Sequence, residues 1–125
     1  MSQENVEVFK RGVDAWNRED FDAWIDHLDP DIEWSARMEV YRGHAGARQL
    51  WQSFKYMRLT VRFEDVRDLG DNVLALGEIT AKGQRTGLDL KSELGQLATF
   101  RDAKVIRYRD FGSHAEAVAA AGLSE

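Results

Sequence analysis

The sequence predicts an α+β fold, because helical and strand patterns are segregated along the chain instead of alternating. Over residues 2–55, apolar side chains recur mostly at helical spacing, with one short strand pattern between the second and third helices. Four consecutive strand patterns separated by turn signals follow over residues 59–111, and a short helix closes the chain. Strands joined by short turns pair as antiparallel hairpins, so we expect helices packed on one face of a curved antiparallel sheet.

Three helices are predicted in the first half of the chain. Asp20 is a capping residue at the start of the second helix, and Pro30 in the sequence DPD ends it, since proline disfavours helical geometry in the residue before it. The third helix begins after YRG, at residues 41–43. The apolar stripes of the three helices are Val6, Phe9, Val13 and Trp16; Phe21, Trp24, Ile25 and Leu28; and Ala47, Leu50, Trp51 and Phe54.

Alternating apolar residues predict the strands, and turn residues separate them. The predicted strands cover residues 31–34, 59–63, 73–81, 88–101 and 105–111. The closing helix opens with the capping-box pattern of Ser113 and Glu116, and Gly122 stands at its C-cap. These signals complete the order α-α-β-α-β-β-β-β-α.

His44 stands between two glycines in RGHAGARQLW, where the third helix begins. Gly43 and Gly46 allow the chain a tight entry, and the apolar stripe of the helix starts directly afterwards. We therefore interpret His44 as a structural residue at a helix N-terminus and not as a catalytic base.

The composition argues against several classes of function. The formal net charge is −5 and the 17 basic residues are scattered, which disfavours nucleic-acid binding. No apolar run approaches the roughly 20 residues of a membrane span, and the N-terminus lacks a secretory signal, so we expect a cytoplasmic protein. The chain has no cysteine, and His27, His44 and His114 match no metal-ligand spacing, so no metal or cofactor is implied. The 125 residues fit one domain, residues 1–125.

Four stretches resemble the SnoaL-like branch of the NTF2-like superfamily and together cover nearly the whole chain. They are the two-helix unit ending in HLDPDIEW, the turn YRGHAG, the strand pair TFRDAKVIRYRDF and the closing EAVAAAGL. The resemblance implies an NTF2-like cone, in which a strongly curved antiparallel sheet packs on three helices, with a short C-terminal helix and a cavity at the wide end. It also implies a homodimer through the outer sheet face. The face of strand 73–81 formed by Val73, Ala75, Gly77 and Ile79 is apolar enough to be that face.

Gln96 is a polar residue on an apolar strand face, which it shares with Ser92 and Leu94. Burying an amide without partners costs about 1–3 kcal/mol. Gln96 therefore either bonds to a neighbouring strand or a dimer partner, or points into the cavity and donates to a ligand carbonyl or oxyanion.

Asp110 is the second candidate chemical group, on the same side of the last strand as Tyr108. Partial desolvation there would raise its pKa toward that of a useful general base. The alternative is an exposed carboxylate that pairs with Arg107 or Arg109, or that supports the start of the following helix. Glu78 is another acid that burial would affect, although it lies near an exposed loop.

Four tryptophans lie on predicted apolar faces, where core packing is the usual role: Trp16, Trp24, Trp34 and Trp51. We expect Trp34 and then Trp16 to line the cavity, with Tyr108 and Ser92 as further ligand-binding residues. Aromatic walls with a few polar groups suit a small apolar or aromatic ligand.

The resemblance also implies which residues of this chain occupy the site positions of known superfamily members. Polyketide cyclases of the superfamily have a histidine and an aspartate on the last two strands, and the matching positions are Gln96 and Asp110. The acid is kept, but the amide cannot carry a proton as imidazole does, although it can donate a hydrogen bond. The positions used by ketosteroid isomerases fall on Gly12, Ser35 and Gln96, which argues against steroid isomerisation by that residue set.

Two functions stay open at this point. The first is a cofactor-independent SnoaL-like enzyme that transfers a proton in an isomerase, cyclase or lyase reaction of an apolar carbonyl compound. Asp110 would accept the proton and Gln96 would donate to the carbonyl or oxyanion. The second is a non-catalytic ligand-binding or dimerisation module, which the absence of a histidine at position 96 favours. A partner-binding protein like the transport factors has little support in the sequence.

Overall fold

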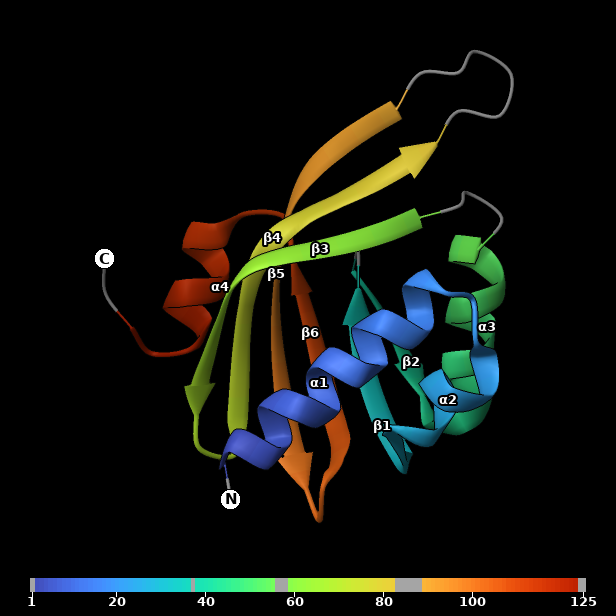
Figure 1. Cartoon of the computed structure of the whole chain (residues 1–125), viewed down its shortest axis with the longest axis horizontal. Coiled ribbons are helices and arrows are strands. Elements are labelled where there is room, and N and C mark those ends of the chain that lie inside the picture. The colour runs from blue at the N-terminus through green and yellow to red at the C-terminus, as the bar shows by residue number, and fades with distance from the viewer. Residues whose placement is uncertain (1, 37, 56–58, 83–88, 124–125) are drawn as a thin grey trace.

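The computed structural model of the chain describes residues 2–36, 38–55, 59–82 and 89–123. Within these ranges the elements are α1 (Ser2–Asn17), α2 (Phe21–Asp26), β1 (Leu28–Ala36), β2 (Glu39–Arg42), α3 (Gly43–Lys55), β3 (Leu59–Leu69), β4 (Asn72–Lys82), β5 (Asp89–Arg101), β6 (Lys104–Phe111) and α4 (His114–Ala120). Figure 1 shows α1 running across the sheet, with α2 and α3 beyond one end of it and α4 apart from them. The predicted α+β class is confirmed. Leu88, predicted to begin a strand, lies outside the described residues.

The starts of α2 and α4 follow the predicted capping signals, but α2 ends at Asp26, before the predicted stop at Pro30, and Leu28 lies in β1 and not on the helix. The Asp20 side chain accepts a hydrogen bond from the backbone N–H of Ala23 at the start of α2, and Ser113 accepts one from that of Glu116 in α4. Gly122 follows α4 with φ of 79°, the left-handed conformation that glycine adopts at a C-cap. None of the described helices is long and apolar enough to span a membrane.

The first two strands differ in detail from the prediction. β1 begins at Leu28 and therefore includes Pro30. Proline is tolerated there because the pairing of β1 with β6 is interrupted at this point, so no backbone donor is needed. β2 was not predicted, since its four residues are mostly exposed and show no alternation of apolar side chains.

The strands form one six-stranded sheet in the order β2-β1-β6-β5-β4-β3. The neighbouring pairs are antiparallel except β1 and β6, which are parallel. The crossover through β2 and α3 lets the chain re-enter the sheet at its far edge. Three hairpins then bring β6 beside β1 in the same direction, so residues from the two ends of the chain become neighbours.

A β-bulge contributes to the curvature of the sheet. Glu64 is an extra residue in β3 where the register with β4 shifts, and Gly77 lies opposite the bulge. A Cβ on Gly77 would lie only 1.9 Å from the carbonyl oxygen of Arg62, so glycine is required at this close approach. Bulges increase strand twist and bend the sheet, which turns the neighbouring strands around the helices.

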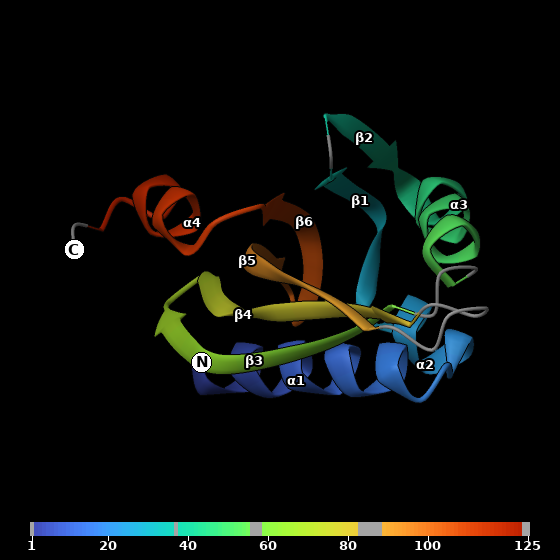
Figure 2. The same ribbon diagram turned by 90° about the horizontal axis from the view of Figure 1, so that it is seen from above.

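The two faces of the sheet are covered by different helices, and Figure 2 shows α1 and α4 on opposite sides of β3 and β4. On the inner face, which packs against α1, Val73 and Ala75 belong to the main core. On the outer face, Leu74 and Leu76 pack against α4 in a smaller core.

The row of β4 that was predicted to form the outer dimer face lies on the inner face of the sheet, so that prediction is wrong. Val73 and Ala75 are fully buried in the main core, and Ile79 lines the cavity described below, so this row of β4 faces inward. Because both rows of β4 are apolar, alternation alone could not tell which row faces outward.

Candidate active site

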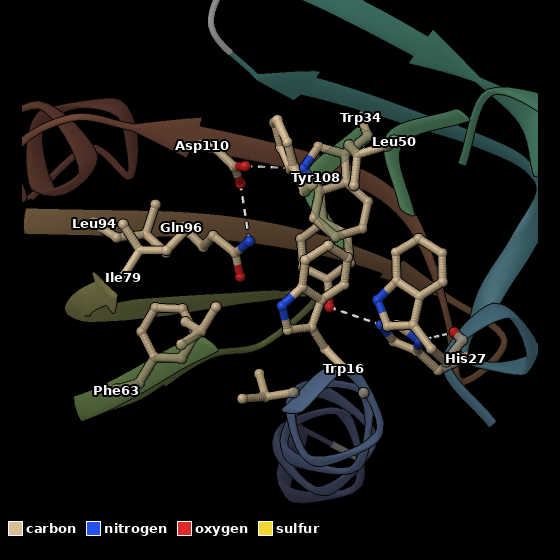
Figure 3. A pocket seen from close by; sticks show the side chains of 15 residues that line it. Trp16, His27, Trp34, Leu50, Phe63, Ile79, Leu94, Gln96, Tyr108 and Asp110 are labelled. Atoms are coloured by element: carbon tan, nitrogen blue, oxygen red, sulfur yellow. Dashed lines mark hydrogen bonds between the residues drawn. The ribbon is translucent and has the colours of Figure 1, made fainter. Parts of the chain in front are cut away.

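A cavity of about 50 Å³ lies between α1, α3 and the inner face of the sheet. Its walls are mainly aromatic and aliphatic, and Figure 3 shows Trp16, Phe63 and Leu94 around it. The polar side chains that line it include those of Gln96, Tyr108 and Asp110. A volume of this size holds a few water molecules or a very small ligand, since one water needs about 10–15 Å³.

The Asp110 carboxylate is held by two neutral hydrogen-bond donors. Its Oδ2 accepts from the indole N–H of Trp34 at 3.1 Å, and its Oδ1 accepts from the amide of Gln96 at 2.9 Å. Gln96 and Asp110 are direct cross-strand partners in β5 and β6, so the sheet register sets this contact. Figure 3 shows both side chains at the same end of the cavity.

The surroundings of Asp110 favour its protonated form. Burial raises the pKa of Asp110 from 3.8 to about 6, while the hydrogen bonds from Trp34 and Gln96 act in the opposite direction. A general base works best when its pKa lies near the operating pH, so this carboxylate is poised to exchange a proton near neutrality. The predicted alternative, an exposed carboxylate paired with an arginine, does not describe this geometry.

A second polar pair lies deeper in the protein. His27 Nε2 lies 2.9 Å from the Tyr108 hydroxyl, and His27 Nδ1 bonds to the backbone carbonyl oxygen of Trp24. Burial lowers the pKa of His27 to about 4, so the ring is neutral. A carbonyl only accepts, so Nδ1 carries the imidazole hydrogen; Nε2 therefore accepts the hydrogen of Tyr108.

The two polar pairs are joined by stacked rings. The Tyr108 ring lies 4.1 Å from the Trp34 ring, centroid to centroid, with an interplanar angle of 31°. Trp34 and Tyr108 are also register partners in the parallel pair β1–β6. The stack therefore connects the His27 pair to the indole N–H that binds Asp110.

The four tryptophans form one cluster, and their roles overlap. Trp24 contacts each of the other three, with ring centroids 5.5 Å from Trp16, 5.7 Å from Trp34 and 4.9 Å from Trp51. Three of them are buried in the core, whereas Trp16 is half-buried. Trp16, Trp24 and Trp34 line the cavity as well, so the same rings pack the core and form the wall.

The structure brings together five of the six predicted site residues: Asp110, Gln96, Trp34, Trp16 and Tyr108. It does not bring Ser92 to them. Ser92 is exposed and borders a separate polar hollow together with Glu78, so neither side chain reaches the Asp110 cavity. The row of β5 that holds Gln96 is buried from Leu94 onward but reaches solvent at Ser92.

His44 has the structural place that the sequence predicts. It lies in the first turn of α3, and its Nε2 donates to the carbonyl oxygen of Leu28 at 2.9 Å. This bond ties the start of α3 to β1.

His27 was missed as a site residue. Its partner Tyr108 lies 81 positions away in the sequence, and nothing local to His27 indicates that contact. The one available signal is Gly12 on the inward side of α1, where a Cβ would lie 2.3 Å from His27 Nε2. Among the described residues, no three His, Asp or Glu side chains are grouped as a metal site requires.

Comparison with known proteins identifies the family. A sequence profile of the SnoaL-like domain matches residues 9–108, which is most of the chain. The chain belongs to the SnoaL-like family. No curated protein sequence matches the chain.

Solved structures agree with this SnoaL-like assignment. A protein from Jannaschia sp. CCS1 described as a SnoaL-like polyketide cyclase is 25% identical with a TM-score of 0.79, covering 97% of this chain and 92% of that one. An NTF2-like protein from Burkholderia xenovorans LB400 is 26% identical with a TM-score of 0.74, covering 97% of each chain. TerC, co-crystallised with polyporic acid, is 18% identical with a TM-score of 0.79, covering 95% of this chain and 98% of that one. The NTF2-like fold is therefore confirmed.

Proposed function

We propose that this SnoaL-like protein is a cofactor-independent enzyme that transfers a proton on a small apolar carbonyl compound. The observation that carries the proposal is the Asp110 carboxylate, held by two neutral donors in an aromatic cavity with its pKa raised to about 6. A partly buried group with a shifted pKa that lines a cavity, as Asp110 does, is a candidate catalytic group. The likeness to a protein described as a SnoaL-like polyketide cyclase adds support.

The proposed step assigns one role to each side chain. Asp110 takes a proton from the carbon next to the substrate carbonyl, and the electron pair of the broken C–H bond moves onto the carbonyl oxygen. Gln96 uses one amide hydrogen to hold Asp110, and its second amide hydrogen donates to the developing oxyanion. Asp110 then returns the proton to another atom of the substrate, which completes an isomerisation.

The size of the cavity limits the substrate. About 50 Å³ is far below the ~300 Å³ or more of typical ligand pockets. A ring-sized substrate enters only if the half-buried side chains Trp16, Phe54 and Phe63 move outward.

Hydrogen exchange at carbon tests the proposal without knowledge of the product. Small cyclic ketones and aryl ketones are incubated with the protein in D₂O, and loss of the α-proton signal is followed by NMR. We expect exchange faster than in buffer for at least one ketone, and Asp110→Asn to lower that rate at least a hundredfold, the usual range for losing a general base.

The matched control is Glu78→Gln, because Glu78 is a half-buried acid outside the cavity. This variant is expected to exchange like the wild type. Exchange that survives in Asp110→Asn with ketone binding intact would remove Asp110 from the mechanism.

The small volume favours one other function, a non-catalytic ligand-binding module. In that case the amide of Gln96 serves only to satisfy Asp110. Ketones that bind the protein without any accelerated exchange would support the module and reject the enzyme.

A further inference from the structure

The hydrogen-bond donors of the cavity are largely used within the protein. The indole N–H of Trp34 goes to Asp110, and that of Trp16 goes to the carbonyl oxygen of Leu59 at 2.9 Å. The Tyr108 hydroxyl hydrogen goes to His27. Among these side chains, Gln96 alone keeps a donor hydrogen, the second one of its amide.

The acceptors, in contrast, remain available. Figure 3 shows the amide oxygen of Gln96 pointing away from Asp110, on the side of Phe63 and Trp16. The Asp110 carboxylate has lone pairs beyond the two it shares with Trp34 and Gln96. The described residues that line the cavity include no lysine or arginine, so Asp110 brings the only formal charge, and it is negative.

His27 determines where the hydroxyl hydrogen of Tyr108 points. Because Nδ1 of His27 is committed to the Trp24 carbonyl and the ring is neutral, Nε2 has no hydrogen and must accept from Tyr108. His27 and Tyr108 both line the cavity, so their hydrogen bond lies at its wall. Figure 3 shows this oxygen between Trp16 and His27. Toward a ligand, the Tyr108 oxygen therefore acts as an acceptor.

We propose that the cavity selects small neutral aromatic molecules that donate a hydrogen bond, and that His27 sets this preference by accepting the hydroxyl hydrogen of Tyr108. A ligand hydroxyl or N–H binds the Tyr108 oxygen while its ring packs among Trp16, Trp34 and Phe63. Carboxylates and other anions are rejected, because they meet the Asp110 charge and no cation. This inference rests on the proposed function only in that the same cavity holds the ligand.

Three single-ring probes test the selection at pH 7. Phenol donates a hydrogen bond, anisole can only accept one, and benzoate carries a negative charge. Titrations followed through the indole N–H signals in ¹H–¹⁵N NMR report binding at the cavity wall. We expect phenol to bind about tenfold more tightly than anisole, the effect of one hydrogen bond, and benzoate to shift no indole signal. Equal binding of phenol and anisole, tight binding of benzoate, or no binding by any probe would overturn the proposal.

Two variants assign the preference to the His27–Tyr108 pair. Tyr108→Phe removes the acceptor oxygen, so phenol and anisole are expected to bind equally. His27→Leu frees the Tyr108 hydrogen to donate to a ligand, so the phenol preference is expected to fall below threefold. His27→Gln is the conservative control, since its amide oxygen can still accept from Tyr108 and is expected to restore the preference. A phenol preference unchanged in both Tyr108→Phe and His27→Leu would reject the assignment.

The same probes in Asp110→Asn separate this inference from the proposed enzyme. That variant cannot transfer the proton, yet it should keep the phenol preference and begin to bind benzoate, because the negative charge is gone. If the ketone exchange fails while these preferences hold, the enzyme is rejected and the selectivity stands. If exchange occurs but the preferences are absent, the selectivity is rejected and the proposed enzyme stands.

Discussion

Replacing Asp110 with asparagine should change how the stability of the protein depends on pH. Burial raises the pKa of Asp110 from 3.8 to about 6. The folded protein therefore holds this proton more tightly than the unfolded chain does. Its stabilising effect is complete below about pH 4 and is lost as the pH rises through 6. The gap between the two pKa values, at about 1.36 kcal/mol per pH unit, corresponds to about 3 kcal/mol.

Urea unfolding of the wild type and Asp110→Asn at several pH values between 4 and 8 measures this effect. All other groups titrate in both proteins, so the difference between the two free energies of unfolding isolates Asp110. We expect the wild type to lose up to about 3 kcal/mol relative to the variant between pH 4 and pH 8.

Two results would refute the reasoning. Parallel curves for the two proteins would mean that the carboxyl is solvated and its pKa ordinary. A wild type that gains stability relative to the variant at high pH would mean that the ionised form is stabilised, which is the opposite sign.

Three further outcomes follow from the site. Trp34→Phe keeps the stacked ring but removes a donor to the carboxylate, so the pKa of Asp110 should rise from about 6 by about one unit. A ¹³C NMR titration of the carboxyl measures this pKa, and an unchanged value would contradict the hydrogen bond. Burial lowers the pKa of His27 to about 4, so its charging costs stability as the pH falls from 6.5 to 4, and its ring signals should titrate near 4. A midpoint near 6.5 would show a solvated ring. Gly12→Ala places a Cβ 2.3 Å from His27 and should lower the free energy of unfolding by about 1–3 kcal/mol, whereas Gly112→Ala meets nothing within 4 Å and should change it by less than about 0.5 kcal/mol. Equal losses in both would exclude the steric argument.

Much of the fold was predictable because its signals are local. Side-chain caps such as Asp20 and Ser113 mark helix starts through bonds to backbone groups three residues away. Alternation in the last two long strands placed Gln96 and Asp110 on inward faces, and both line the cavity. The edge strand β2 was missed because exposed residues carry no such alternation.

The candidate site was predictable only where strand alternation carries the information. Ser92 shares a row with Gln96, but alternation does not say where along the row the core ends. The row of β4 that holds Val73 was assigned to the wrong face, because α4 covers an equally apolar row on the other side.

By itself, the sequence determined the class of the fold, the family and the inward position of the acid and the amide. The fold class and the inward positions depend on periodicity and capping, which act within a few residues, whereas the family follows from the resemblance of four stretches to the SnoaL-like branch. Only the tertiary structure decided that Gln96 and Trp34 both bind Asp110, and that His27 accepts a hydrogen bond from Tyr108, 81 positions away. Contacts of this kind are set by strand register and by the parallel pairing of β1 with β6, which no local pattern encodes. Desolvation, which shifts the pKa of Asp110, likewise arises only when distant segments close over it.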